Sequence, residues 1–207
     1  PPAVCAIADV PPGGYEVRGE SPGHRVAHDC MTITPPAGTH VAYTLTDAPT
    51  VLLMAGDARH FSGAGQYYAQ ALDELGYVYD TWRVLDRDFP KLPSQATLAG
   101  YDVVIWTHDI SSPGYIRASS LLQGYLDGGG RLILAGQNVV CTDSGQPPCG
   151  QEWMRQPYLS QRLHTQLVDD AALTGGVTGL PGSALDGIQV SFEAPDGMAQ
   201  YEPDVLS

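Results

Sequence analysis

The sequence predicts an α/β protein with a doubly wound, mostly parallel sheet, preceded by a small β-rich unit. Between residues 51 and 138, unbroken apolar runs alternate with segments of helical spacing, which is typical of strands buried on both faces and covered by helices. Residues 1–47 instead alternate apolar and polar side chains, as half-exposed antiparallel strands do. We therefore expect two units. The first, 1–47, is interpreted as the end of a β-sandwich, and the second is an α/β domain over 50–207 that we expect to be incomplete at its carboxyl end.

Each expected element follows from residue type and spacing. The β-rich unit contains three short strands, at 15–19, 25–34 and 39–46. The α/β domain contains four strands, at 51–56, 77–84, 101–109 and 131–138. Helices are expected at 66–76, 115–127 and 157–168, a single helical turn within 86–100, and a late strand at 187–192. Right-handed crossovers place the first strand of the domain centrally, beside the second and third.

Composition excludes several kinds of partner. The chain has 207 residues with 23 acidic and 10 basic side chains, a formal net charge of −13. Nucleic acids and anionic membrane surfaces are bound by clustered Lys and Arg, so neither is an expected partner. No apolar run approaches the roughly 18 residues that a membrane span requires, so we expect no membrane insertion.

The four cysteines predict an oxidising compartment. Cys141 and Cys149 bracket a short polar loop that closes easily on itself, which leaves Cys5 and Cys30 to pair in the amino-terminal unit. Two disulfides place the protein outside the cell or at the cell surface. The alternative is four reduced, buried cysteines in a cytosolic protein.

Polar residues at the strand ends form the candidate site. Ligands of open parallel sheets bind outside the carboxyl ends of the strands, and there this chain carries Asp57, His60, His108, Asp109, Gln137 and Asn138. The carboxylates and imidazoles among them could hold a divalent metal, and His108 could act as a base. The alternative is ordinary loop chemistry, because a chain becomes polar as it leaves the core and Asp caps turns and helices. The sequence does not say whether a metal is bound.

Nucleotide and nucleophile motifs are missing. Gly63 and Gly65 do not complete a dinucleotide fingerprint, and the chain contains no phosphate-binding loop ending in Gly-Lys-Ser/Thr. No nucleophile elbow follows any strand; at the fourth strand that position carries Gln137. Cys141 lies close by, but pairing with Cys149 would remove the thiolate that a nucleophile needs. We therefore expect no cofactor and assign no catalytic residue.

Several segments resemble a known family. GYDVVIW (100–106) and YLDGGGRLILAGQ (125–137) are the most specific of them, and over about 51–207 the chain looks like a class I glutamine-amidotransferase-like, flavodoxin-like module. Such modules occur in large secreted bacterial proteins, often beside subtilisin-like peptidase domains and β-sandwiches. The resemblance implies the fold and an accessory role. It does not imply the activity, because the family's catalytic cysteine position carries Gln137 and no histidine follows His164.

The functional expectation is a non-catalytic extracellular module of a larger secreted or surface protein, with a structural, adhesive or assembly role. Its partners would be other domains of the parent chain, or neighbouring copies that pair through edge strands near 1–47. The alternative is a secreted, metal-assisted hydrolase of carbohydrate or peptide that uses Asp57, His108 and Asp109. A small-ligand binder that uses the point where the strand order reverses is a third reading.

Overall fold

A four-stranded parallel sheet forms the centre of the protein. The computed structural model describes residues 7, 9–34, 42–55, 65–84, 91–107, 113–136, 139–147, 150–165, 167–169, 176–179, 181–182, 186–191 and 205–206. The strands are β3 (Val51–Ala55), β4 (Tyr79–Arg83), β5 (Val103–Thr107) and β6 (Arg131–Ala135), in the order β4-β3-β5-β6. The predicted central position of β3 is confirmed. All five of its residues are buried, which explains its unbroken apolar sequence.

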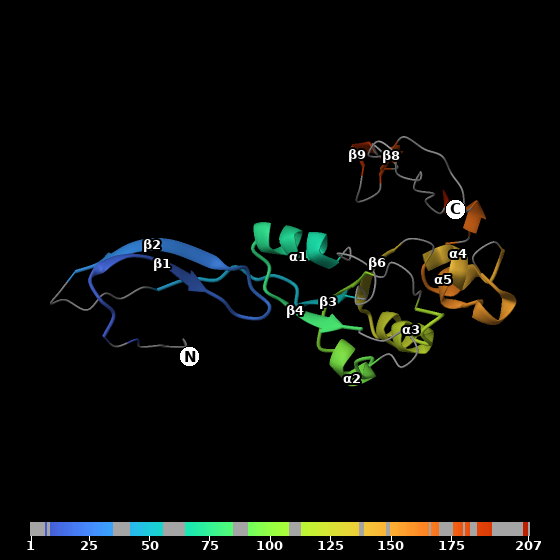
Figure 1. Cartoon of the computed structure of the whole chain (residues 1–207), viewed down its shortest axis with the longest axis horizontal. Coiled ribbons are helices and arrows are strands. Elements are labelled where there is room, and N and C mark those ends of the chain that lie inside the picture. Colours follow the sequence, from blue (N-terminus) through green and yellow to red (C-terminus); the bar gives the residue numbers. More distant parts are fainter. Residues whose placement is uncertain are drawn as a thin grey trace, which may run out of the picture.

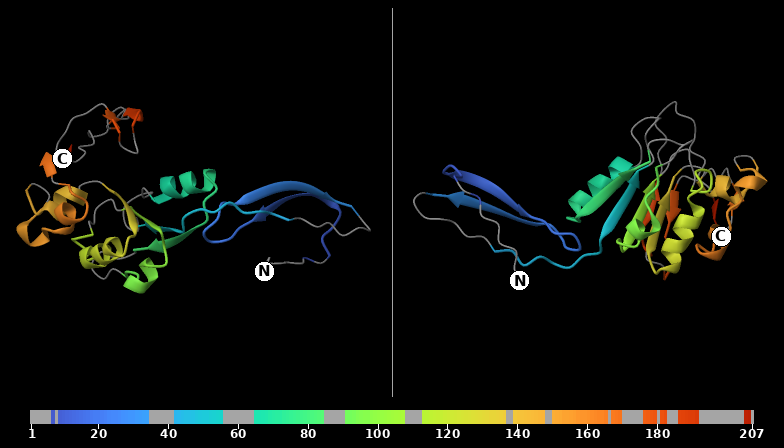
Figure 2. Two further views of the ribbon diagram at one scale, coloured as in Figure 1. Left: turned by 180° about the vertical axis from the view of Figure 1, so that it is seen from behind. Right: turned by 90° about the horizontal axis from the view of Figure 1, so that it is seen from below.

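Helices cover both faces of this sheet, as predicted. Helix α1 (Gly65–Glu74) packs on one face, and helices α2 (Gln95–Leu98) and α3 (Ser119–Asp127) pack on the other (Figures 1 and 2). Alternate residues of each strand therefore enter different cores. Val51 and Leu53 contact the α1 layer through Leu72, whereas Leu52 and Met54 join the larger core that contains Leu122. The protein is thus a mixed α/β structure with an all-parallel sheet.

Helix α1 ends in a Schellman motif, at the glycine that the sequence predicts. Gly76 has φ +70°; its amide donates to Asp73 O, and the Tyr77 amide donates to Leu72 O at 2.8 Å. Leu75 lies in this turn and is 61% exposed.

A β-hairpin precedes the sheet and projects from it (Figures 1 and 2). Strands β1 (Gly13–Gly19) and β2 (Ala27–Ile33) are antiparallel, with Tyr15 opposite Met31. The third strand expected at 39–46 is wrong in its described part, since residues 42–46 belong to no strand. They run beside the hairpin: the Arg25 amide donates to Thr46 O at 2.7 Å, and the Tyr43 hydroxyl donates to Val17 O at 3.3 Å.

The hairpin is joined to the sheet domain at the carboxyl end of α1. The guanidinium carbon of Arg25 lies 3.6 Å from the centre of the Tyr77 ring, and the same guanidinium donates to the carbonyl of Leu75. The Val26 amide donates to Gly76 O at 2.8 Å. Arg25 therefore places a cation against the carbonyls and the negative end of a helix, which is a favourable location.

The segment after β6 folds into short elements. They are α4 (Val139–Ser144), the 3₁₀ turn η1 (Glu152–Met154), α5 (Tyr158–Gln161), and the strands β7 (Leu167–Asp169), β8 (Gly176–Thr178), β9 (Gln189–Ser191) and β10 (Val205–Leu206). Strand β9 lies within the strand predicted at 187–192, and it pairs with β8. Among the described residues, no helix is long and apolar enough to cross a bilayer.

The predicted helix over 157–168 is wrong beyond its first turn. Helix α5 ends at Gln161, and His164 adopts φ +52°, a left-handed conformation that turns the chain. Arg162 at the end of α5 forms an ion pair with Asp127 at the end of α3, with Nε–Oδ1 and Nη2–Oδ2 distances of 2.5 and 3.2 Å. A tertiary ion pair and a sharp turn thus replace the expected continuation of the helix.

Candidate functional site

The carboxyl ends of three parallel strands form one edge, where the sequence places its candidate site. In the register of the sheet, Ala55 lies opposite Thr107, and Thr107 lies opposite Ala135. The predicted residues follow these strand ends along the chain. Asp57, His60, His108, Asp109, Gln137 and Asn138 all lie outside the described residues. Their convergence on one site therefore stays a prediction.

The start of α1 packs tightly against this edge. A Cβ atom on Gly65 would lie 3.1 Å from the Ala55 Cβ and 3.4 Å from the Thr107 Oγ1, so only glycine lets the first helical turn come this close. The Thr107 hydroxyl is buried and donates to Met54 O at 3.3 Å. Between β3 and β5, where the strand order reverses, small residues thus bring the helix directly onto the strand ends.

A buried carboxylate lies farther along, in α4, which begins four residues after β6 ends. Asp143 is completely buried. Its Oδ1 and Oδ2 accept hydrogen bonds from the Gly114 amide at 3.1 and 3.0 Å, and its Oδ2 also accepts one from the Tyr158 hydroxyl at 2.7 Å. Asp143 therefore connects α4 and α5 to the segment that follows β5.

Electrostatics keeps the tyrosine of this cluster protonated. Burial is the largest cause that raises the pKa of Tyr158 far above its ordinary value. The negative charge of Asp143 and the hydrogen bond to it raise this pKa further. The phenol therefore remains a hydrogen-bond donor over the whole accessible pH range. Asp143 and Tyr158 act chemically as a fixed acceptor and a fixed donor that hold three chain segments together.

This cluster is not evident from the sequence, in which residues 141–149 have the composition of a polar loop between two cysteines. One signal was present: Asp143 follows Val139 at the i, i+4 spacing of a helix face, and both residues are buried. The partners gave no signal, since the bond from Gly114 to Asp143 spans 29 residues and depends on tertiary structure.

Two cysteines lie within the described residues. Cys30 is a free, exposed thiol on β2, and its expected partner Cys5 lies outside the described residues. Cys141 is completely buried, and its expected partner Cys149 lies outside the described residues. Both expected pairings therefore stay predictions.

Histidines and carboxylates of the described part of the chain lie apart or in simple pairs. His24 Nε2 lies 3.5 Å from Asp47 Oδ1, and His28 Nδ1 lies 3.2 Å from Glu16 Oε1. In that part, no three His, Cys, Asp or Glu side chains come together in a way that could hold a metal ion.

Together, the fold and this edge define a mixed α/β protein with a four-stranded parallel sheet and a buried Asp–Tyr cluster beside its carboxyl edge. No protein-family model, curated protein or solved structure matches the chain significantly. The amidotransferase-like resemblance therefore stays a prediction.

Proposed function

We propose that the chain is a non-catalytic extracellular module, with a flavodoxin-like fold and a structural, adhesive or assembly role in a larger secreted or surface protein. The strand order supports the fold assignment. Numbered along the chain, the four parallel strands lie in the order 2-1-3-4. Flavodoxin-like sheets have the order 2-1-3-4-5, so the observed sheet corresponds to their first four strands.

One observation supports the proposal that the module is non-catalytic. The described polar groups beside the carboxyl edge form hydrogen bonds that stabilise the fold. The Thr107 hydroxyl donates to a carbonyl of β3, and Asp143 accepts from a backbone amide and a buried phenol. Cys141 is completely buried, whereas a cysteine nucleophile requires an accessible thiolate. These groups suit a rigid scaffold.

The location and partners of the module follow from its cysteines and its hairpin. The predicted disulfide between Cys141 and Cys149 would be typical of an oxidising compartment. An isolated two-stranded hairpin is marginally stable, and none of the fourteen residues of β1 and β2 is fully buried. Neighbouring domains of the parent chain, or strands from neighbouring copies, are therefore the proposed partners of the hairpin.

An activity screen tests the proposal. The purified chain is assayed against peptide, ester and glycoside substrates, with and without a chelator, beside an Asp57→Ala/His108→Ala double variant. We expect equal background rates in all samples. Turnover that disappears with the chelator or in the double variant would establish the hydrolase instead. Light scattering of the same sample measures self-association, and a concentration-independent monomer would remove the assembly role.

A further inference from the structure

A cavity of about 300 Å³ lies at the opposite, amino edge of the sheet, where the hairpin meets the α/β domain. The turn of the hairpin contributes one wall, and the first residues of β3 and β4 together with the segment between α2 and β5 contribute the others. The lining residues are Pro22, Gly23, Thr50, Val51, Val78, Tyr79, Asp80, Thr97, Gly100 and Tyr101. Junctions between structural units are common places for small-ligand sites, and this volume is at the lower end of their range.

Among the described residues, the lining contains one carboxylate, that of Asp80, and no basic side chain. Asp80 is exposed, and the only hydrogen bond it receives within the described chain comes from the Tyr101 hydroxyl, to Oδ2 at 2.7 Å. This bond fixes the carboxylate and leaves Oδ1 available as an acceptor. The bond to Asp80, followed by burial, raises the pKa of Tyr101 to about 12, so the phenol remains a donor to the carboxylate at neutral pH.

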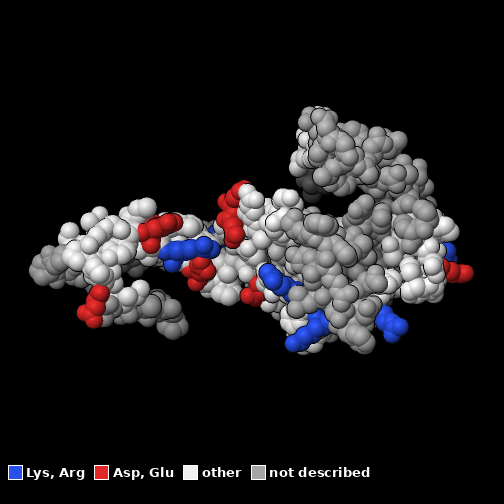
Figure 3. All heavy atoms as spheres, viewed as in Figure 1, with Lys and Arg blue, Asp and Glu red and all other residues white. Residues whose placement is uncertain are grey.

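The electrostatic surroundings also favour a cation. At the same edge, Asp102 Oδ2 accepts from the amide and the hydroxyl of Thr50, at 2.8 and 2.9 Å, and these bonds lower the pKa of Asp102. Asp102 thus places a carboxylate with a lowered pKa at this edge, and the charge of Arg131 contributes to that shift. The chain as a whole carries a net charge of −13. On the face drawn in Figure 3, acidic side chains lie over the hairpin and its junction with the α/β domain, with basic side chains among them.

We propose that this cavity binds a guanidinium group, with the carboxylate of Asp80 as its ion-pair partner and the ring of Tyr101 as its aromatic wall. A guanidinium is planar, presents paired N–H donors to a carboxylate and stacks on aromatic rings. Tyrosine rings attract cations in addition. A cavity of this size accommodates one such group and its alkyl stem, which is the chemistry of free arginine or of an arginine side chain on another polypeptide.

The test is a titration followed by amide NMR spectra of the whole chain, with N-acetyl-argininamide as the probe. We expect millimolar binding and shifts at the amides of Asp80, Gly100 and Tyr101. N-acetyl-citrullinamide has nearly the same shape without the charge, and it should not bind. An arginine-containing pentapeptide compares the two sources of the group: tighter binding than the single residue favours a polypeptide ligand, and equal binding favours a free one.

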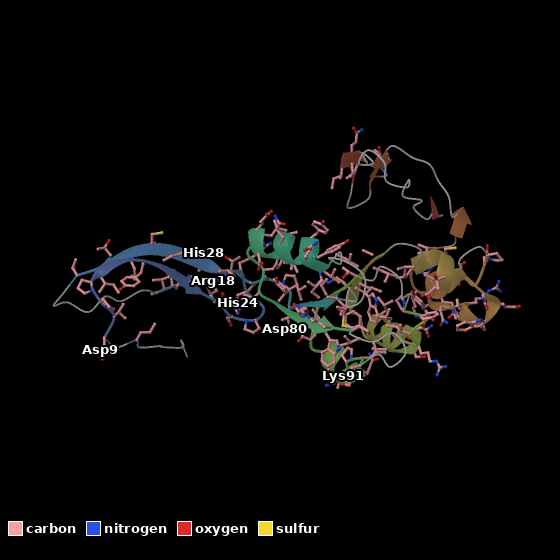
Figure 4. All side chains as sticks on the ribbon, viewed as in Figure 1. Asp9, Arg18, His24, His28, Asp80 and Lys91 are labelled. Carbon is pink, nitrogen blue, oxygen red and sulfur yellow. The ribbon has the colours of Figure 1, made fainter. Side chains whose placement is uncertain are left out.

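Two variants of equal charge give the decisive comparison. Asp80→Asn should weaken binding at least about tenfold, because a charged hydrogen-bonded pair is lost. Asp9→Asn removes a carboxylate at the far end of the hairpin (Figure 4), and Asn tolerates the φ of +58° there, so binding should be unchanged. The amide spectra report whether each variant is folded. If the Asp80→Asn variant is not folded, Tyr101→Phe takes its place in the comparison. Equal affinity in all variants, or shifts confined to other regions, would overturn the proposal.

Discussion

At the scale of single residues, the segment after β5 is held by a contact that leaves no room for a side chain. The Gly114 amide faces both oxygens of the buried Asp143 carboxylate. A Cβ on Gly114 would lie 2.9 Å from Asp143 Cγ and would also overlap the side chain of Gln156. The glycine is therefore required by close approach, since its φ is not in the left-handed region.

Replacing this glycine tests the buried cluster. Gly114→Ala should destabilise the protein by about 2 kcal/mol, because the methyl group forces apart a well-packed hydrogen-bonded site. Gly14→Ala is the matched control: no atom lies within 4 Å of its new Cβ, and stability should stay within about 0.5 kcal/mol. Denaturant unfolding of both variants measures the difference, and equal midpoints would show that the cluster around Asp143 is not rigid.

A second residue-scale prediction concerns acid. The hydrogen bonds from the Thr50 amide and hydroxyl hold the pKa of Asp102 below its ordinary value, which is about 3.9 in an unfolded chain. Asp102 therefore binds a proton more readily in the unfolded chain than in the folded protein. The contribution of its hydrogen bonds to the free energy of unfolding is complete above the pKa of the unfolded chain, and it is lost as pH falls through the lower pKa of the folded protein. The difference in unfolding free energy between wild type and Asp102→Asn should therefore shrink from pH 5 to pH 2. A difference that is constant over this range would contradict the role of these bonds.

At the scale of elements, the end of α1 depends on one backbone conformation. Gly76 has φ +70°, and a Cβ there would meet only the Val26 carbonyl, at an ordinary 3.9 Å. Gly76→Ala should therefore cost about 1 kcal/mol through backbone strain alone. Gly76→Asn should cost less, because Asn enters the left-handed region more easily. Thermal or denaturant unfolding would rank the three proteins, and an Asn variant less stable than the Ala variant would contradict this explanation.

The sheet was the most predictable part of the molecule, because its elements carry local signals. The unbroken apolar run at β3 and the glycine after α1 correctly indicated a buried strand and a helix end. Elements defined by tertiary contacts were not predictable. The segment at 157–168 has helical spacing, but the turn at His164 and the Arg162–Asp127 ion pair end the helix. Residues 42–46 have strand-like composition, but they contact the hairpin through single bonds.

The sheet edge at which the candidate site is expected was predictable, whereas the convergence of the site residues stays a prediction. The register of the parallel strands brings Ala55, Thr107 and Ala135 to one edge, as the alternation of strands and helices indicated. The Asp143–Tyr158 cluster beside that edge depends on packing between segments distant in sequence. Neither residue belongs to a motif, so local pattern could not reveal their contact.

At the scale of the whole molecule, Arg25 supplies several of the contacts that join the hairpin to the sheet domain within the described residues. Its guanidinium lies over Tyr77 and donates to the Leu75 carbonyl in the turn after α1, and its backbone forms an antiparallel bridge with Tyr77. The hairpin has no fully buried residue of its own. Its order should therefore depend on this attachment more than on its own packing.

Arg25→Ala tests this dependence. Loss of the guanidinium removes the cation–π contact and the bond at the helix end, so the amides of β1 and β2 should exchange with solvent about five- to tenfold faster, which corresponds to about 1 kcal/mol. The amides of β3 and β5 should keep their protection, since both strands are buried in the sheet. Arg18→Ala is the control, because its ion pair with Glu20 is half-exposed and should contribute little. Uniformly faster exchange in hairpin and sheet alike would mean that the two units unfold together, and Arg25 would then stabilise the whole fold.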